Sequence, residues 1–207
     1  EKILTLKNGV KLISRIWHPR IEGCLPALLM RQPYGREIAS TITYAHPLWW
    51  ASNGYMVIIQ DVRGQGDSEG VFEGFIQESN DTSETRAWVR SLRECNGKLG
   101  LYGFSYQGLT QLTGNDISSP PDCLAPAMTG LNIKDHWSSD GGAFWWHNNI
   151  AWALQIASFK MKRDKNDMGW LDIRSSLENK TYLQNGLELI QKYDPNNFNI
   201  QWNNLLN

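Results

Sequence analysis

The feature that most constrains this chain is a serine at the corner between an expected strand and an expected helix. A chain that turns this sharply at Ser105 needs small residues two places before the serine and two or three places after it, where strand and helix nearly touch. Gly103 and Gly108 meet this requirement, although Gln107 stands where the plain G-x-S-x-G pattern has glycine. The arrangement predicts a nucleophile elbow, with an ordinary turn rich in Gly and Ser as the alternative.

Strand and helix signals alternate along the first part of the chain. The alternating segment at 3–18 is divided by Asn8-Gly9, the strongest short hairpin signal, because both residues tolerate positive φ. Largely apolar runs, typical of strands covered on both faces, alternate further on with segments of helical spacing. The expected strands are 25–30, 55–62, 98–102 and 123–128, and the expected helices are 46–53, 80–94 and 106–113. This order predicts an α/β fold with a parallel or mixed sheet wrapped by helices.

The residues after about 131 differ in character. Strand signals stop there, and the rest of the chain is aromatic, helical and interrupted by short polar loops. Helices are expected at 143–161 and 180–192. We therefore expect a sheet-bearing part at 1–135 and a helical cap at 136–207, with no strand of the main sheet in the cap.

Composition excludes several classes of partner. The chain has 207 residues, a formal net charge of −1 and no run of Lys or Arg, so neither nucleic acid nor a membrane surface is an expected partner. No apolar run approaches the about 20 residues that a membrane-spanning helix needs, and no export signal is visible. Cys24, Cys95 and Cys123 form no C-x-x-C pair, which predicts buried free thiols in a reducing compartment, hence a cytoplasmic location. No metal and no cofactor is expected.

The polar loop after the expected strand at 55–62 contains Gly64-x-Gly66, which is similar to the start of a dinucleotide-binding loop. The third glycine of that pattern would fall at Glu69, whereas Gly70 comes one place later and no helix follows directly. The loop is therefore interpreted as structural, with Arg63 paired to an acidic residue.

Further motifs accompany the elbow. In chain order they are Arg31-Gln32-Pro33-Tyr34, Gly54-Tyr55, Gln60-Asp61-Val62-Arg63-Gly64, Ser68-Glu69-Gly70 and Asn96-Gly97-Lys98-Leu99-Gly100. In this order and spacing, over residues 3 to about 160, the motifs resemble those of the cocaine-esterase / X-Pro dipeptidyl-peptidase (CocE/NonD) family. The resemblance implies an α/β-hydrolase sheet, mostly parallel with an antiparallel N-terminal hairpin, followed by part of a helical cap.

The resemblance also implies a role for each matching position. Ser105 would attack an ester or amide carbonyl and form an acyl-enzyme, while the Tyr34 hydroxyl and the Tyr106 amide would form the oxyanion hole. The implied substrates are small acyl esters or X-Pro-type dipeptides. As alternatives, Tyr34 is a buried tyrosine after a strand, and the side chain of Tyr106 only packs while its amide acts.

The aromatic stretch at 136–152 falls where relatives build the acyl pocket. Phe144, Trp145 and Trp146 would provide apolar contact to an acyl or aromatic group, and Asp140 would lie near a substrate amine. The alternative is that these aromatic residues form the core of the cap, or a surface that another part of the protein covers.

The remaining members of a catalytic triad have no clear candidates. α/β-Hydrolases place an acid and then a histidine after later strands, whereas the only histidines after Ser105 are His136 and His147. Relatives carry both residues beyond a complete cap, so we expect the triad Asp and His outside this chain, which is then an incomplete fragment. The alternative is a non-catalytic hydrolase-like fragment that binds a complementary C-terminal polypeptide. Binding of carbohydrate or aromatic ligands by the ten tryptophans is a third hypothesis.

Overall fold

The computed structural model describes residues 1–38, 44–114 and 119–197. The chain packs into two compact units. The first unit comprises residues 1–70 and 75–129, and the second comprises residues 71–74 and the residues from 130 onward.

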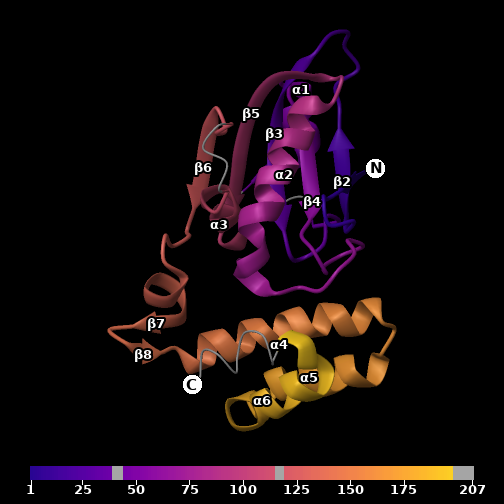
Figure 1. Ribbon diagram of the computed structural model, residues 1–207. Coiled ribbons are helices and arrows are strands. Elements are labelled where there is room, and N and C mark those ends of the chain that lie inside the picture. Colours follow the sequence, from indigo (N-terminus) through magenta and orange to yellow (C-terminus); the bar gives the residue numbers. More distant parts are fainter. Residues whose placement is uncertain (39–43, 115–118, 198–207) are drawn as a thin grey trace. The chain divides into compact units, whose positions relative to one another are not determined.

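The first unit is built on a six-stranded sheet (Figure 1). Its strands are β1 (Lys2–Thr5), β2 (Lys11–Trp17), β3 (Leu25–Gln32), β4 (Met56–Asp61), β5 (Cys95–Phe104) and β6 (Cys123–Ala127). The spatial order is β1-β2-β4-β3-β5-β6, with antiparallel pairing for β1/β2 and β2/β4 and parallel pairing between the other neighbours. This confirms the predicted hairpin around Asn8-Gly9 and the predicted mostly parallel sheet.

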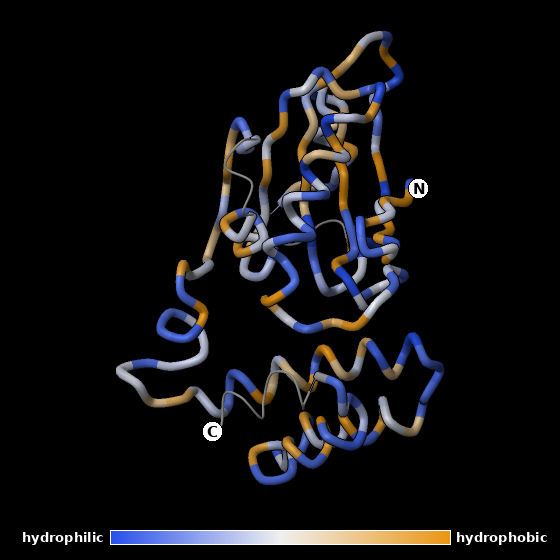
Figure 2. Tube along the Cα trace, in the orientation of Figure 1, coloured by the Kyte–Doolittle hydropathy of each residue, from blue (hydrophilic) through white to orange (hydrophobic). Residues whose placement is uncertain are grey.

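The central strands are apolar on both faces because helices cover both faces. Ile58 of β4 shares a hydrophobic cluster with Val89 of α2 (Glu78–Ser91), whereas the next residue, Ile59, shares one with Ala51 of α1 (Pro47–Ser52). Side chains alternate between the two faces of a strand, so covering both requires an uninterrupted apolar run. In Figure 2 such hydrophobic stretches follow the central strands of this unit.

Helix α2 buries a polar stripe that the sequence analysis did not predict. The helix was expected at 80–94 from the spacing of Ala87, Val89 and Leu92, but Ala87 is exposed. The helix begins earlier, after a short 3₁₀ turn (η1, Gly74–Gln77). The polar side chains that it buries in its first turns are Glu78, Asp81, Thr82, Thr85 and Arg86. Buried polar groups need hydrogen-bond partners, and Glu78 accepts hydrogen bonds from Arg31 and from the Tyr106 hydroxyl.

Strand β5 begins at Cys95, earlier than the expected start at 98. The parallel pairing of β3 with β5 shifts register between Leu25 and Ala27, whose partners are Cys95 and Leu99. This irregularity accommodates Asn96-Gly97 inside the strand, although the dipeptide is a turn signal in a sequence.

The three cysteines are free, but the expectation that they are buried is wrong. Cys24 and Cys123 are exposed and Cys95 is half-buried. Cys24 directly precedes β3, while Cys95 and Cys123 are the first residues of β5 and β6. The thiols therefore lie at the amino ends of strands, outside the central segments that the helices cover.

The second unit is mainly helical. After a π-helical turn (η2, Lys134–Ser138), its elements are β7 (Ser139–Asp140), β8 (Ala143–Phe144), α4 (Trp146–Arg163), α5 (Asp167–Glu178), α6 (Tyr182–Tyr193) and α7 (Pro195–Asn197). The helix expected at 143–161 starts later, because Ala143 and Phe144 pair with β7 in a separate two-stranded sheet. Between residues 140 and 197, no strand joins the six-stranded sheet.

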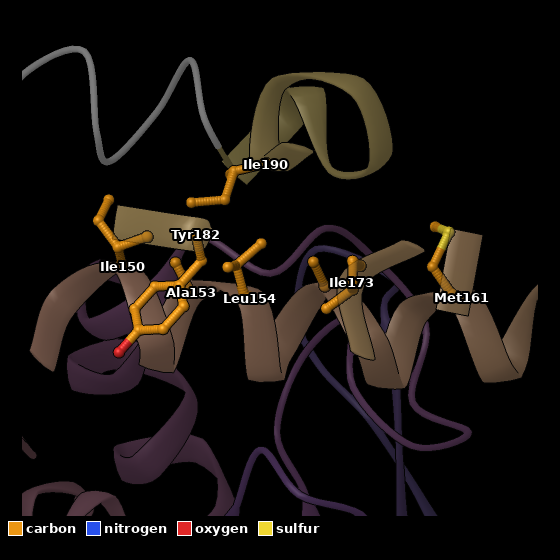
Figure 3. Packing of buried hydrophobic residues seen from close by; sticks show 8 residues of the cluster. Ile150, Ala153, Leu154, Met161, Ile173, Tyr182 and Ile190 are labelled. Carbon is orange, nitrogen blue, oxygen red and sulfur yellow. The ribbon is translucent and has the colours of Figure 1, made fainter. Parts of the chain in front are cut away.

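The helices of the second unit share a core along one side of α4. Ile150 and Leu154 of α4 contact a cluster that includes Ile173 of α5 and both Tyr182 and Ile190 of α6 (Figure 3). Residues four apart lie on the same face of a helix, which explains why one stripe of α4 is buried. Over 1–38, 44–114 and 119–197, the structure has no helix with both the length and the apolar character needed to cross a membrane.

Candidate active site

Ser105 occupies the corner between the carboxyl end of β5 and the start of α3 (Tyr106–Leu112). Its backbone has φ 58° and ψ −120°, a conformation that residues other than glycine rarely adopt. The Ser105 N–H donates to the Ala127 carbonyl at 2.9 Å, and the Ser105 carbonyl accepts the N–H groups of Gly108 and Leu109 at 2.9 and 3.0 Å. The side chain does not cap α3, and the residue is half-buried. This is the strand–serine–helix geometry that the sequence predicts.

The glycines on either side of the corner are required by close packing. A Cβ at Gly103 would lie 2.4 Å from Gln107 Cβ, and one at Gly108 would lie 3.0 Å from two side-chain atoms of Thr129. Position 107 does not require glycine, because the Gln107 side chain points into the interior of the unit and is buried there. The plain G-x-S-x-G pattern is thus relaxed at the one place where the fold leaves room for a side chain.

The Tyr106 side chain is anchored in the interior. Its hydroxyl donates to Glu78 Oε1 at 2.8 Å, and its ring stacks on Phe75 with centroids 5.0 Å apart. Burial and then the neighbouring Glu78 raise the pKa of the Tyr106 phenol well above its usual value, so the phenol remains a donor. The side chain of the residue after the serine is therefore a structural anchor.

A buried ion pair supports this anchor. Arg31 Nη1 lies 2.5 Å from Glu78 Oε2, and the two side chains are 1% and 0% exposed. Arg31 also donates to Gln60 Oε1 at 2.8 Å and to the Thr82 hydroxyl at 2.5 Å. Burial raises the pKa of the Glu78 carboxyl, whereas the Arg31 guanidinium favours its charged form. The arginine of the R-x-P-Y segment is thus connected to the residue that follows the nucleophile.

Tyr34 lies two positions after Gln32, the last residue of β3, and is half-buried. Strands β3 and β5 are parallel neighbours, so the segment after β3 and the elbow after β5 emerge at the same edge of the sheet. The two segments are joined by a 2.6 Å hydrogen bond from Gln107 Nε2 to Gln32 Oε1. The structure therefore brings the Tyr34 segment and the Ser105 elbow together, although 71 residues separate them in the sequence.

The loop that follows β4 is organised by charged pairs at Asp61, the last residue of the strand, and at Arg63. The Asp61 carboxylate is fully buried, contacts Arg36 Nη1 at 2.7 Å and accepts the Asp67 N–H at 3.1 Å. A Cβ at Gly66 would lie 2.2 Å from that carboxylate, so the loop closes tightly around it. Arg63 makes a bidentate pair with Asp81 at 2.7 and 2.9 Å, which confirms the expected acidic partner. These contacts account for the loop as a structural element.

The four residues expected in the substrate pocket lie in the second unit. Phe144 and Trp146 pack against the helical core, and Trp146 Nε1 donates to the Leu183 carbonyl at 3.0 Å. Trp145 is half exposed and Asp140 is exposed in the short β7–β8 ladder. Of these three aromatic residues, Trp145 is the most exposed to solvent, whereas Phe144 and Trp146 are half-buried against the helical core.

Both histidines after Ser105 are engaged within the second unit. His136 Nδ1 accepts the N–H groups of Leu131 and Asn132 at 3.1 and 3.2 Å. His147 Nδ1 forms a short hydrogen bond with the Tyr182 hydroxyl. One ring nitrogen of each histidine thus serves the local structure.

A mostly parallel sheet flanked by helices, with a strained serine between a strand and a helix, defines the α/β-hydrolase class. The sequence model of the X-Pro dipeptidyl-peptidase (S15) family matches residues 8–206. The chain therefore belongs to this family. A curated relative, cocaine esterase from Rhodococcus sp. (strain MB1 Bresler), is 29% identical over 161 residues, which cover 75% of this chain and 28% of that protein.

Solved structures show the same fold. A CocE/NonD family hydrolase from Staphylococcus aureus superposes with a TM-score of 0.67 at 21% identity, covering 76% of this chain and 32% of the other. An aminopeptidase from a marine sediment Thaumarchaeota archaeon has a TM-score of 0.59 at 26% identity, covering 73% and 29%. The chain thus spans about a third of the length of these relatives and matches a hydrolase family of the cocaine-esterase and X-Pro peptidase type.

The local sequence does not predict the buried network beneath the elbow. Arg31 and Gln32 belong to one of the family motifs, whereas Glu78 lies in none of them. The available signal was an arginine at the end of an apolar strand and an acid at the start of a helix, each of which is also common on surfaces. Their pairing depends on which face of the sheet α2 covers, which the local sequence does not encode.

Proposed function

We propose that Ser105 is the nucleophile of a serine hydrolase that acts on acyl esters or X-Pro-type dipeptides. The observation that carries this proposal is the positive φ of Ser105, 58°, between β5 and α3. A non-glycine residue keeps such a conformation only where the surrounding structure enforces it, and this kind of strain concentrates at functional sites. Membership of a hydrolase family supports the same assignment.

In the proposed reaction, Ser105 Oγ attacks the substrate carbonyl carbon while a histidine takes the hydroxyl proton. The Tyr34 hydroxyl and the Tyr106 amide donate hydrogen bonds to the oxyanion that develops on the carbonyl oxygen. The C–O or C–N bond then breaks, the histidine returns the proton to the leaving alcohol or amine, and water hydrolyses the acyl-serine. Trp145, with Phe144 and Trp146, is proposed to contact the acyl group, and Asp140 a substrate amine.

We further propose that the triad Asp and His come from polypeptide outside these 207 residues. The local hydrogen bonds of His136 and His147 support this proposal, because each occupies one ring nitrogen in the second unit. The share of the relatives that the chain covers, 28% of cocaine esterase, also supports it.

The second candidate function is binding of a complementary polypeptide without catalysis. Among the described residues β6 is an edge strand, paired only with β5. Its first four residues are exposed, and Leu124 keeps 42% of its surface open. An exposed apolar edge strand is a template for pairing with another chain. A second polypeptide that supplies the Asp and His would serve both candidate functions.

The isolated chain is expected to hydrolyse p-nitrophenyl acetate weakly or not at all, and to react poorly with a fluorophosphonate probe. A serine hydroxyl without a base is almost wholly protonated at neutral pH. Co-production with a polypeptide from the adjoining coding sequence that carries the Asp and His should restore labelling. Ser105→Ala should then abolish it, whereas Ser139→Ala, a serine of the second unit, should not. Mass spectrometry of the labelled peptide identifies the reacting serine.

Two outcomes would contradict this assignment. Strong turnover by the isolated chain that is lost in His136→Ala or His147→Ala would show that the base lies within the second unit. Turnover that survives Ser105→Ala would remove the proposed nucleophile. Binding of the second polypeptide without any labelling of Ser105 would favour the non-catalytic function.

Tyr34→Phe tests the oxyanion assignment in the reconstituted protein. Loss of one oxyanion donor lowers kcat by about 10²–10³-fold in hydrolases of this kind, and we expect a loss of that size with little change in KM. Tyr55→Phe is the matched control, because Tyr55 is also a half-buried tyrosine but precedes the amino end of β4. Equal effects of the two substitutions on kcat would show that Tyr34 acts only through packing.

A further inference from the structure

Two buried glutamines connect the candidate nucleophile to the candidate oxyanion donor. The Phe104 N–H donates to Gln107 Oε1 at 3.1 Å, and Gln107 Nε2 donates to Gln32 Oε1 at 2.6 Å. Gln32 Nε2 in turn donates to the carbonyls of Gly35 and Ile38 at 2.9 and 2.8 Å. The chain of hydrogen bonds thus runs from the residue before Ser105 to both sides of the turn that follows Tyr34.

Backbone groups at both ends determine which side-chain atoms donate and which accept in this series of hydrogen bonds. An N–H group at Phe104 requires an acceptor, so the oxygen of Gln107 faces it and the nitrogen faces Gln32. Two carbonyls at Gly35 and Ile38 require a donor, so the nitrogen of Gln32 faces them. The two glutamines are 0% and 3% exposed, so water does not compete for their hydrogen bonds. A satisfied buried network of this kind holds one arrangement.

Both segments that the glutamines join carry a group of the proposed reaction. Gln32 is the last residue of β3 and stands two places before Tyr34, while Gln107 stands two places after Ser105. Glycine at position 107, as in the plain G-x-S-x-G pattern, would have no side chain with which to make this link. The hydrogen bond between the Ile38 N–H and the Gly35 carbonyl, 3.0 Å, closes the turn that Gln32 clasps.

We propose that Gln32 and Gln107 are positioning residues that set the Tyr34 hydroxyl against the Ser105 elbow. This inference rests on the proposed function and adds how the oxyanion donor is held. Neither glutamine takes part in proton transfer or contacts the reacting atoms. Their effect is on the place of Tyr34, and a displacement of about 1 Å in such a group can cost about 10²-fold in rate.

The test compares phosphonylation of Ser105 in single and double variants of the reconstituted protein. Gln107→Glu keeps the shape but loses the donor, so two acceptors face each other at Gln32. We expect the maximal labelling rate to fall about 10–100-fold, with an unchanged half-saturating probe concentration. In the Tyr34→Phe background the same substitution should lower the rate only about twofold or less, because the group that it displaces is absent.

Gln111→Glu is the matched control. Gln111 lies one turn further along α3, is equally buried, and its amide bonds to the carbonyls of Gly103, Gln107 and Ala125 and not to the Tyr34 segment. Its effect on the labelling rate should be the same with and without Tyr34. Additive effects of Gln107→Glu and Tyr34→Phe would overturn the positioning role. If Gln107→Glu does not fold, Gln32→Met removes the same link from the other side.

Hydrogen exchange of the chain itself separates this inference from the proposed function. The Ile38 amide should exchange faster in Gln107→Glu than in the unmodified chain. The Phe104 amide, whose acceptor oxygen glutamate keeps, and the Ala125 amide, which donates to Gln111 Oε1 at 3.0 Å, should not change. Unchanged exchange at Ile38 would show that the bridge does not hold the Tyr34 turn. Absence of labelling in the reconstituted unmodified protein, with faster exchange in the variant, would instead contradict only the hydrolase assignment and leave the bridge established.

Discussion

Gly103→Val is expected to lower the free energy of unfolding of the first unit by about 2–6 kcal/mol, the sum of backbone strain and overpacking. The backbone at Gly103 has φ 150°, which side chains disfavour, and a Cβ would lie 2.4 Å from Gln107 Cβ and 2.9 Å from the Gln107 carbonyl carbon. The second contact is with backbone, so a change of rotamer cannot relieve it. Either α3 moves away from β5 or the strand end distorts, and both displace Ser105.

Gly97→Ala measures the cost of backbone strain without a steric clash. Gly97 lies in the same strand with φ 87°, but a Cβ there would meet no atom within 4 Å. Its substitution should therefore cost only the strain, about 1 kcal/mol. Urea unfolding, monitored by hydrogen exchange of the β5 amides, measures the loss in free energy of unfolding for both variants. Equal losses would mean that the close approach of strand and helix at the elbow does not contribute to stability.

Glu78→Ala is expected to destabilise the first unit by about 3–5 kcal/mol, because it leaves the Arg31 guanidinium buried without a counter-charge. The loss also removes the acceptor of the Tyr106 hydroxyl, so the residue after the nucleophile loses its anchor. The same unfolding experiment measures the effect. A loss below about 1 kcal/mol would show that water or another acid replaces Glu78.

The double substitution Glu78→Leu with Arg31→Met is the informative comparison. Removing both charges with residues of similar volume is often neutral or stabilising, so stability should recover toward that of the unmodified chain. Labelling of Ser105 in the reconstituted protein should remain lower, since Tyr106 still lacks its acceptor. Recovery of both stability and labelling would mean that the ion pair serves folding alone.

Local patterns in the sequence determined the type and order of most elements. The Asn8-Gly9 hairpin, the apolar run of β4 and the strand–serine–helix corner each depend on residues within a few positions of one another. Such signals follow from the periods of strands and helices and from the φ angles that a turn requires. They were misleading where a neighbouring strand changed the outcome, as at Asn96-Gly97 within β5 and at Ala143, which pairs with β7 before α4 begins.

The tertiary structure alone decided which distant residues meet. The order β1-β2-β4-β3-β5-β6 places β3 beside β5, and only then can Gln107 reach Gln32, 75 residues away. Likewise, Glu78 lies two positions before the helix that the sequence predicts at 80–94, yet the packing of α2 against the sheet buries it beside Arg31. A buried polar group requires a partner but does not specify in its own sequence which residue that partner is, because burial and partners are properties of the packed chain.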